Sequence, residues 1–357
     1  MLEPIVDLAD YRRNHGAYGI IGKSSRMREA FEIIEKVAHV NVPVLIVGES
    51  GTGKEKIAKA IHERSGRIPY VAINCGAFTE SLLESELFGH ARGAFTGAVR
   101  DKSGYFEIAS KGTILLDEIL YMSPKMQVDL LRVLQEGEYR RVGDTAVGRT
   151  DARAIAAASG SIEQAVREGK FSEPLFYRLA VVSIELPPLR ERDNDILLLA
   201  RYFCRKSCNT YEKPPLCIDD EAANFLQFGY HWPGNVRELE TVIRRVVLLE
   251  SEKAKARTVD GHPGVLIKED FESHLKPLRY NQTSYDDLCN QVASRIGNGD
   301  IALYTLMNEF EQKLIKKALE RTRGNISQAA EFLRLGNSTL QNKMKGHGIK
   351  RSDFKPN

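Results

Sequence analysis

The chain has 357 residues, 42% of them hydrophobic, which is enough for two or three domains with buried cores. Its net charge of +3 is too small to indicate nucleic-acid binding, so any such signal has to come from local patterning. The sequence has no apolar run as long as a membrane span and no basic-then-apolar order at its start. These features exclude a membrane-spanning or secreted protein, and we expect a cytoplasmic location.

The sequence between residue 27 and about residue 185 alternates helical and strand patterns, which predicts a mostly parallel sheet flanked by helices. The first helix has an apolar face of Met27, Ala30, Phe31, Ile34 and Val37. The predicted strands are residues 43–47, 69–73, 112–116 and 153–157. The other helices are residues 54–64 and a segment with apolar residues Met126, Leu130, Leu131 and Leu134. The fold class is therefore α/β.

The strand patterns stop after Pro187 and Pro188, and residues 193–249 are expected to form a small helical domain on the sheet. Residues 251–300 are rich in charged and turn-forming residues, which predicts a linker with little fixed structure. A last helical unit is expected over residues 301–355.

The five cysteines fit reduced thiols better than a disulfide framework, because they are odd in number and scattered, at 75, 204, 208, 217 and 289. Cys204 and Cys208 are spaced to share a helix face. The alternative interpretation is a zinc site made of these two cysteines together with Cys217 and His231. Since the sequence has no CxxC pair, buried free thiols are the preferred interpretation.

The segment GESGTGKE (48–55) follows a predicted strand and opens a predicted helix, which is the context of a phosphate-binding P-loop. Its glycines let backbone N–H groups face phosphates, and Lys54 adds a positive charge beside the helix N-terminus. Glu55 stands where the usual Ser or Thr ligand of Mg²⁺ would be. The alternative is a glycine-rich turn that binds no nucleotide. The strand, the glycines and the lysine together favour ATP with Mg²⁺.

The segment GTILLDEI (112–119) ends an apolar strand in two carboxylates. After a P-loop, such a pair indicates that Asp117 helps to hold Mg²⁺ and that Glu118 polarises the attacking water. Hydrolysis also needs positive charge at the γ-phosphate. Two segments, 176–192 and 232–239, contain arginines that could supply this charge. The candidates are Arg178, Arg190, Arg192 and Arg237.

Phe95 and Thr96 stand between glycines in GHARGAFTGAV (89–99), a stretch too rich in glycine for regular structure. An exposed aromatic residue between hinge glycines is costly unless something binds it. The pattern predicts a loop whose tip contacts a partner, with a packed surface loop as the alternative.

The segments GESGTGKE, GAFTGA, GTILLDEI, FYRL followed by LPPLRER, and WPGNVREL, in this order, closely resemble the AAA+ domain of bacterial enhancer-binding proteins, the activators of sigma-54 RNA polymerase. The resemblance runs from about Ile20 to Leu249 and continues at the C-terminus. It implies a short extension (1–19), an α/β ATPase subdomain (20–187), a helical lid (188–250), a linker (251–300) and a Fis-type helix-turn-helix domain (301–357).

The resemblance also assigns roles to single residues. It implies that ATP binds along Gly48, Glu49, Ser50, Gly51, Thr52, Gly53, Lys54 and Glu55. Asp117 matches the Mg²⁺ ligand, Glu118 the residue that activates water, and Asn74 the asparagine that restrains this glutamate. Arg237 matches the sensor arginine of the lid, which binds the nucleotide. The loop that contacts the sigma factor matches Gly93, Ala94, Phe95, Thr96, Gly97 and Ala98.

Arg178 matches an arginine finger that reaches the ATP of the next subunit, which implies a ring, expected to be a hexamer of one kind of subunit or of two. The chain departs from the family pattern nearby. Ser172 stands where a second arginine is usual, Ala158-Ser159 where Thr-Asn is usual, and Leu120 where glycine is usual. These departures bear on the rate of hydrolysis more than on its existence.

The C-terminal segment 324–351 predicts two short helices around a tight turn, after a helix with apolar residues Leu306, Met307, Phe310, Leu314, Ala318 and Leu319. The unit resembles the Fis-type DNA-binding domain, with a second helix from about Ser338 to Lys345. The residues expected at double-stranded DNA are Ser338, Thr339, Gln341, Asn342, Lys343 and Lys345, with Lys350 and Arg351 near phosphates. A helical bundle that serves only dimerisation is the alternative.

The leading hypothesis is an ATPase that binds upstream DNA and remodels the closed complex of sigma-54 RNA polymerase. One alternative is a DNA-binding regulator whose ATPase is weak or decayed, and another is one subunit of a hetero-oligomeric activator. A general AAA+ chaperone or helicase loader is disfavoured, because it has no use for GAFTGA or for the terminal helix-turn-helix. About twenty residues precede the AAA+ core, so we expect no N-terminal regulatory domain.

Overall fold

The structure is a computed structural model that describes residues 16–258, 263–275, 303–322, 324–333, 335–349 and 354. The chain divides into two compact units, Met1–Leu275 and Lys276–Asn357. Within the described ranges, no helix is both long and apolar enough to cross a membrane. Residues 1–15 and 276–302, for which the sequence predicted an N-terminal extension and part of the linker, lie outside the described residues.

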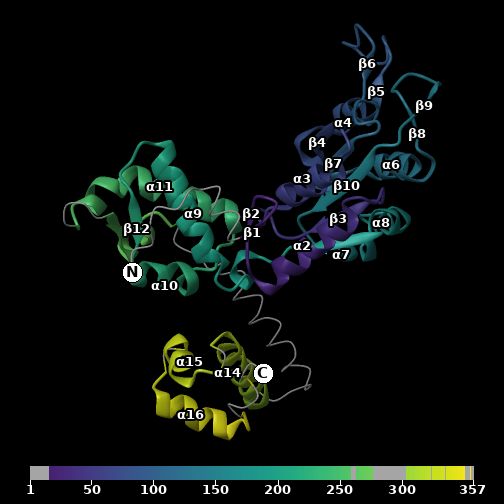
Figure 1. Ribbon diagram of the computed structural model, residues 1–357. Helices are drawn as coiled ribbons and strands as arrows, with labels where there is room; N and C mark the ends of the chain where they lie inside the picture. The colour runs from purple at the N-terminus through teal and green to yellow at the C-terminus, as the bar shows by residue number, and fades with distance from the viewer. Residues whose placement is uncertain are drawn as a thin grey trace. The chain divides into compact units, whose positions relative to one another are not determined.

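The first unit is built on a five-stranded parallel sheet with strand order β11-β3-β10-β7-β4, which confirms the α/β class (Figure 1). The strands in chain order are β3 (Val44–Val47), β4 (Tyr70–Asn74), β7 (Thr113–Asp117), β10 (Arg153–Ala158) and β11 (Val182–Glu185). β10 lies in the middle and pairs Ala158 with Val47 of β3 and Ala156 with Leu116 of β7. All six residues of β10 are buried, because helices cover both faces of the sheet.

Successive residues of β10 belong to two hydrophobic cores, one on each face of the sheet. Ile155 and Ala157 pack with α2 (Ser25–Val37) and α3 (Lys54–Ser65). Ala154, Ala156 and Ala158 belong to the other core, which the remaining helices of the sheet domain cover. These are α4 (Glu80–Phe88), α5 (Tyr105–Ile108), α6 (Pro124–Glu136), α7 (Ile162–Arg167) and α8 (Glu173–Leu179). The five apolar residues predicted for the first helix are all buried in α2.

A third core belongs to the helical lid, which follows η3 (Leu189–Glu191). Its helices are α9 (Asp195–Thr210), α10 (Asp220–Asn224), the π-helical turn η4 (Phe225–Gly229), α11 (Asn235–Lys255) and α12 (Lys268–Glu272). The expectation that strands end at Pro188 was wrong, because β12 (Leu216–Ile218) pairs in parallel with β13 (Gly264–Leu266). The predicted linker was wrong over the described residues 251–258 and 263–275, where the end of α11, β13 and α12 provide regular structure.

Two hairpins that the sequence patterns did not predict extend from the α/β part, side by side (Figure 1). One joins β5 (Gly89–His90) to β6 (Lys102–Ser103), and the other joins β8 (Glu138–Arg140) to β9 (Val147–Arg149). Val142 donates its N–H to Gly89 O and accepts the N–H of Ala91, which ties the hairpins together. The remaining short elements are β1 (Gly16–Ala17), β2 (Ile20–Ile21), η1 (Cys75–Ala77) and η2 (Ile119–Tyr121).

The second unit contains α14 (Leu303–Arg321), α15 (Ile326–Phe332) and α16 (Asn337–Gly346), so the helix-turn-helix prediction is confirmed. Its core consists of Ile315, Ala318, Leu319, Ala329, Ala330, Leu340, Met344 and Ile349. Leu314 was assigned to this core wrongly: it is 43% exposed, and its neighbour Ile315 takes the buried place. The predicted core residues Leu306, Met307 and Phe310 lie outside the residues whose side chains are described.

Arg153, at the start of the central strand, is buried although it carries a charge. Its guanidinium donates to the backbone carbonyls of Val37 (2.7 Å), Ala38 (2.6 Å) and Val42 (3.3 Å), the chain that leads from α2 to β3. Burial lowers the pKa of Arg153 to about 10. Two of these carbonyls, Val37 O and Ala38 O, lie at the C-terminal end of α2, where the helix itself supplies no donors, and Val37 O also accepts the N–H of Val40. The bond to Val42 O holds the segment that precedes β3.

We predict that Arg153→Ala lowers the free energy of unfolding by about 2–4 kcal/mol, because it leaves buried carbonyls unpaired. Urea unfolding followed by circular dichroism measures the change. Arg28→Ala is the control, since its exposed guanidinium donates to Lys23 O at the surface, and it should cost less than about 0.5 kcal/mol. Equal midpoints for the two variants would contradict the role given to Arg153.

Candidate functional site

The phosphate loop connects β3 to α3, and its glycines adopt conformations that other residues rarely reach. Gly51 and Gly53 have φ values of +79° and +105°. A Cβ on Gly51 would lie 2.3 Å from Gly234 O of the lid, whereas a Cβ on Gly53 would meet nothing within 4 Å. The loop therefore packs on the lid at Gly51 and stays open at Gly53, next to the free N–H groups of the first turn of α3. This geometry fits a bound phosphate.

Lys54 is the first residue of α3, and its side chain turns back into the loop. Its ammonium donates to Gly48 O (2.9 Å), Glu49 O (3.3 Å) and Ser159 Oγ (2.6 Å). Burial lowers the pKa of Lys54, and the carboxylates of Glu118 and Asp117 oppose that shift. The structure therefore brings together the lysine and the two acidic residues that the sequence analysis assigned to one site.

Asp117 is the last residue of β7, the neighbour of β10 in the sheet, and Glu118 follows it directly. Asp117 Oδ1 accepts the backbone N–H of Glu118 at 3.0 Å, and burial raises the pKa of Asp117. Glu118 has a left-handed backbone (φ 54°), and its Oε1 accepts a hydrogen bond from Ser159 Oγ at 2.6 Å. A half-buried carboxylate next to a second one suits a hard divalent cation such as Mg²⁺. Asn74 does not meet Glu118 among the described bonds; it accepts the N–H of Gly76 and caps η1.

A cavity lies between the phosphate loop and the lid. Its polar residues are Ser50, Thr52, Lys54, Glu55, Lys56, Asp117, Glu118, Arg192, Lys206, Arg237 and Glu240, with Gly19, Gly51 and Gly53. Its apolar wall consists of Ile20, Ile21, Leu199, Tyr202, Phe203 and Val236. The sequence analysis missed this wall, although Leu199, Tyr202 and Phe203 recur at helical spacing in α9. The combination of an apolar wall and a phosphate loop matches the two ends of a nucleotide.

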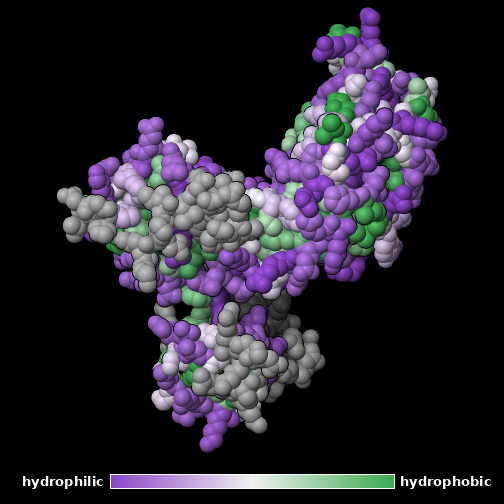
Figure 2. Space-filling model, viewed as in Figure 1, coloured by the Kyte–Doolittle hydropathy of each residue, from purple (hydrophilic) through white to green (hydrophobic). Residues whose placement is uncertain are grey.

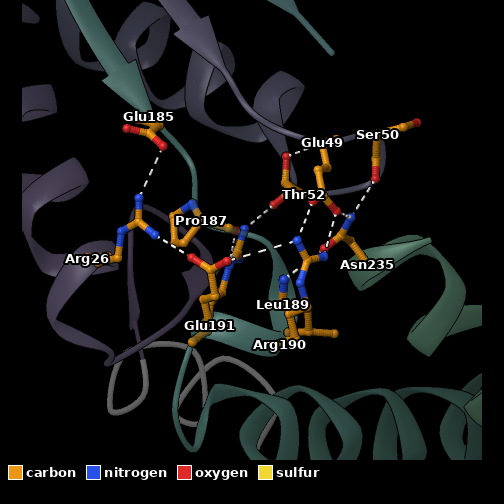
Figure 3. Close-up of polar contacts among 11 residues, drawn as sticks. Arg26, Glu49, Ser50, Thr52, Glu185, Pro187, Leu189, Arg190, Glu191 and Asn235 are labelled. Atoms are coloured by element: carbon orange, nitrogen blue, oxygen red, sulfur yellow. Dashed lines mark hydrogen bonds and ion pairs between the residues drawn. The ribbon is translucent and has the colours of Figure 1, made fainter. Parts of the chain in front are cut away.

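Glu49 of the phosphate loop directs its carboxylate to the lid side (Figure 3). Arg190 of η3 donates to both oxygens, at 2.6 and 3.0 Å, and Asn235 Nδ2 donates to Oε2 at 3.0 Å. Asn235, buried and at φ 53°, also donates to Ser50 O and accepts the N–H of Leu189. Glu49 thus joins the start of α11 to the loop, so its side chain is committed to the lid.

The other candidate arginines have different surroundings. Arg192 is buried and donates to Thr52 O (2.7 Å) and Pro187 O (2.9 Å), so it supports the loop from behind. Arg237 is on α11, 3.5 Å from Ser50 Oγ, and lines the cavity as expected of a nucleotide sensor. Arg178 is exposed on α8, where it donates twice to Leu134 O, and it is not among the cavity residues. Ser172 caps α8.

The GAFTGA loop forms the tip of the β5–β6 hairpin. Gly93 and Gly97 have positive φ values, 84° and 104°, and Gly93 N–H donates to Ala98 O at 2.8 Å. Phe95 is 46% exposed, and its ring packs edge-on against His90 at 4.9 Å, whereas Thr96 is exposed and Ala98 is buried. The surface in the view of Figure 2 is mainly hydrophilic with scattered hydrophobic residues, and Phe95 is one of several large hydrophobic side chains that are exposed.

The residues of α16 that were predicted to contact DNA differ in their exposure to solvent. Ser338, Thr339, Gln341, Asn342 and Lys345 are exposed. Lys343 is half-buried and pairs with Glu311 of α14, which also accepts from His347 at 2.8 Å. The phosphate role predicted for Lys343 therefore competes with an internal ion pair. Lys350 and Arg351 lie outside the described residues.

The described cysteines are free thiols: Cys75, Cys204 and Cys208 are buried, and Cys217 is half-buried. Within the described part of the chain, no group of three or more His, Cys, Asp or Glu side chains is arranged to hold a metal ion. The zinc alternative therefore has no support there. Cys289 lies outside the described residues.

The phosphate loop, the acidic strand end and the lid arginine around one cavity define a P-loop nucleotide-binding protein of the AAA+ type. Family models match three successive parts of the chain: the Sigma-54 interaction domain over residues 20–185, the AAA+ ATPase lid domain over 190–260, and the bacterial regulatory protein family Fis over 306–347.

Similar proteins cover most of the chain. The DNA-binding transcriptional regulator NtrC of Azospirillum brasilense is 41% identical over 335 residues, which are 91% of this chain and 69% of that protein. The Phenol regulator MopR of Acinetobacter guillouiae is 38% identical over 92% of this chain and 56% of its own length. The crystal structure of NtrX from Brucella abortus with ATP has a TM-score of 0.68 and 30% identity, over 92% of this chain and 70% of that one.

The chain belongs to the family of sigma-54-dependent transcriptional activators, the bacterial enhancer-binding proteins. It spans between about half and two thirds of the length of its curated relatives, 49% for the Nif-specific regulatory protein of Azotobacter vinelandii and 69% for NtrC.

We predict that Lys54→Ala weakens the binding of Mg²⁺-ATP at least about tenfold, because a charge-assisted contact to phosphate is lost. Titration with a fluorescent ATP analogue measures the affinity. Lys59→Ala is the matched control on the same helix, since Lys59 is exposed and pairs with Glu63. Affinity in Lys54→Ala equal to that in the control would contradict the assignment of the phosphate loop.

Proposed function

We propose that the protein hydrolyses ATP and uses the energy to remodel the closed promoter complex of sigma-54 RNA polymerase, from a site on upstream DNA. The observation that carries the proposal is the convergence of Lys54, Asp117, Glu118 and Arg237 on one cavity, in a chain that also has the GAFTGA hairpin. Membership of the activator family supports the same function. The NtrX structure that matches the chain contains ATP, which supports this nucleotide as the ligand.

In this proposal the P-loop amides and Lys54 hold the phosphates, and the apolar wall at Ile20, Ile21 and Tyr202 receives the base. Asp117 holds Mg²⁺, which neutralises charge on the phosphates when it is bound. Glu118 orients and polarises the attacking water. Asn74 remains a candidate for the control of Glu118, from its place at the end of β4, where it pairs with Asp117.

Arg178 is proposed to act in the site of a neighbouring subunit. Its guanidinium is exposed and lies outside the cavity of its own chain, bonded to Leu134 O. An arginine that completes the site of the next subunit needs a ring with heterologous interfaces, and we propose a hexamer. Since Ser172 caps α8 and supplies no positive charge, Arg178 is the arginine on this helix that can serve.

The GAFTGA loop is proposed to contact the sigma factor through Phe95 and Thr96. The hinge glycines at 93 and 97 and the exposure of Phe95 support a tip that can leave His90 for a partner. Upstream DNA is proposed to bind α16, with Thr339, Gln341 and Asn342 reading base edges, and Lys345 near phosphates. Because DNA and RNA polymerase are its proposed partners, we assign the protein to the cytoplasm.

We predict that Phe95→Ala abolishes promoter opening, with a loss of at least about tenfold, because the aromatic contact at the tip is removed. A half-exposed side chain contributes little to the fold, so ATP turnover and DNA binding should stay within about twofold of wild type. Heparin-resistant open complexes on a sigma-54 promoter, counted with ATP present, measure the effect.

Val99→Ala is the control for this experiment. Val99 is 82% exposed and follows the loop directly, so its removal should leave promoter opening within about twofold of wild type. Normal promoter opening by Phe95→Ala would refute the proposed role of the loop.

A further inference from the structure

Ser159 lies between the lysine and the glutamate of the nucleotide site. Lys54 Nζ donates to Ser159 Oγ at 2.6 Å, and Ser159 Oγ lies 2.6 Å from Glu118 Oε1. An ammonium can only donate and a carboxylate can only accept, so the hydroxyl proton points to Glu118 and an oxygen lone pair faces Lys54. The bonds therefore run in one direction, from Lys54 through Ser159 to Glu118.

The protons of Lys54 are fully used in this arrangement. Besides Ser159 Oγ, the ammonium has Gly48 O at 2.9 Å and Glu49 O at 3.3 Å as acceptors. An ammonium has three protons, and each has one acceptor here. A phosphate that binds Lys54 must therefore displace at least one of these oxygens.

Ser159 holds the side chain of Glu118 by a hydrogen bond. The backbone of Glu118 is in the left-handed region, at φ 54°, and its carboxylate accepts the hydroxyl of Ser159. Next to Ser159, a Cβ on Gly160 would lie 3.7 Å from Leu120 Cδ1, so the segment after β10 runs close to η2. Leu120 and Ser159, which thus belong to neighbouring segments, are both positions at which the sequence departs from the family pattern.

We propose that Ser159 is a positioning residue that restrains Glu118 while the phosphate loop lacks nucleotide, and that a nucleoside triphosphate releases Glu118 by drawing Lys54 onto its phosphates. The loss of the donor Lys54 weakens the bond from Ser159 to Glu118, because linked hydrogen bonds polarise one another. ATP and Ser159 therefore compete for the same ammonium. This inference rests on the proposed ATPase function and concerns how that site is regulated.

The test compares three variants of the full chain for ATP affinity and for turnover at saturating ATP. Ser159→Ala should tighten ATP binding about threefold to tenfold, because Lys54 no longer has to give up a hydrogen bond. It should raise turnover about threefold or more, because Glu118 is no longer restrained. Ser159→Thr retains the hydroxyl and should behave as wild type.

Ser161→Ala is the matched control in the same segment, since the Ser161 hydroxyl caps α7 by accepting the N–H of Gln164 at 3.1 Å. It should change neither quantity. Weaker binding with slower turnover in Ser159→Ala would overturn the inference, because the hydroxyl would then act on the nucleotide itself. No change in either quantity would overturn it as well.

The failure of this inference and the failure of the proposed function give different results. If the wild-type protein bound ATP without hydrolysing it, the proposed function would fail. The affinity comparison between Ser159→Ala and Ser159→Thr would still decide whether ATP and Ser159 compete for Lys54.

Discussion

The register of three parallel strands is the constraint on which the nucleotide site depends. β10 pairs with β3 on one side and with β7 on the other, so the loops that follow all three strands leave the sheet at the same edge. In a parallel sheet this edge is where ligands bind. The register brings Ser159 within hydrogen-bonding distance of both Lys54 and Glu118, residues that are far from it in sequence. A shift of one strand by one residue would separate them and would also turn the side chains of that strand to the opposite core.

The helical lid supplies the second half of the nucleotide site. The start of α11 is fixed to the phosphate loop by Asn235 and by the bond from Val236 N–H to Gly51 O at 3.0 Å. The same helix carries Arg237 to the cavity. Arg190 and Asn235 both donate to the carboxylate of Glu49. A movement of the phosphate loop therefore shifts the hydrogen-bond acceptor that holds the start of α11. The site is therefore formed by both parts of the first unit.

The sequence predicted those parts of the site that depend on local spacing. The glycines of the loop, Lys54 at the helix start and Asp117-Glu118 at a strand end are local patterns, whereas the strand order was not predicted. The apolar face of α2 was predicted fully. By contrast, β12 and β13 are three residues each and are separated by a long segment, so no local pattern indicates their pairing. The pair of hydrogen bonds from Lys54 to Ser159 and from Ser159 to Glu118 was also not predictable. It depends on distances between side chains that follow three different strands.

The central claim is that subunits complete one another's sites through Arg178. The most direct measurement is ATP turnover per subunit as a function of protein concentration, for wild type, Glu118→Gln and Arg178→Ala, and for a mixture of the two variants. The account predicts that wild-type turnover rises with concentration, that each variant alone is inactive, and that the mixture regains part of the activity. Mixed rings pair an intact Glu118 with an intact Arg178 in some sites. A turnover per subunit that does not depend on concentration, or a mixture without activity, would contradict the account.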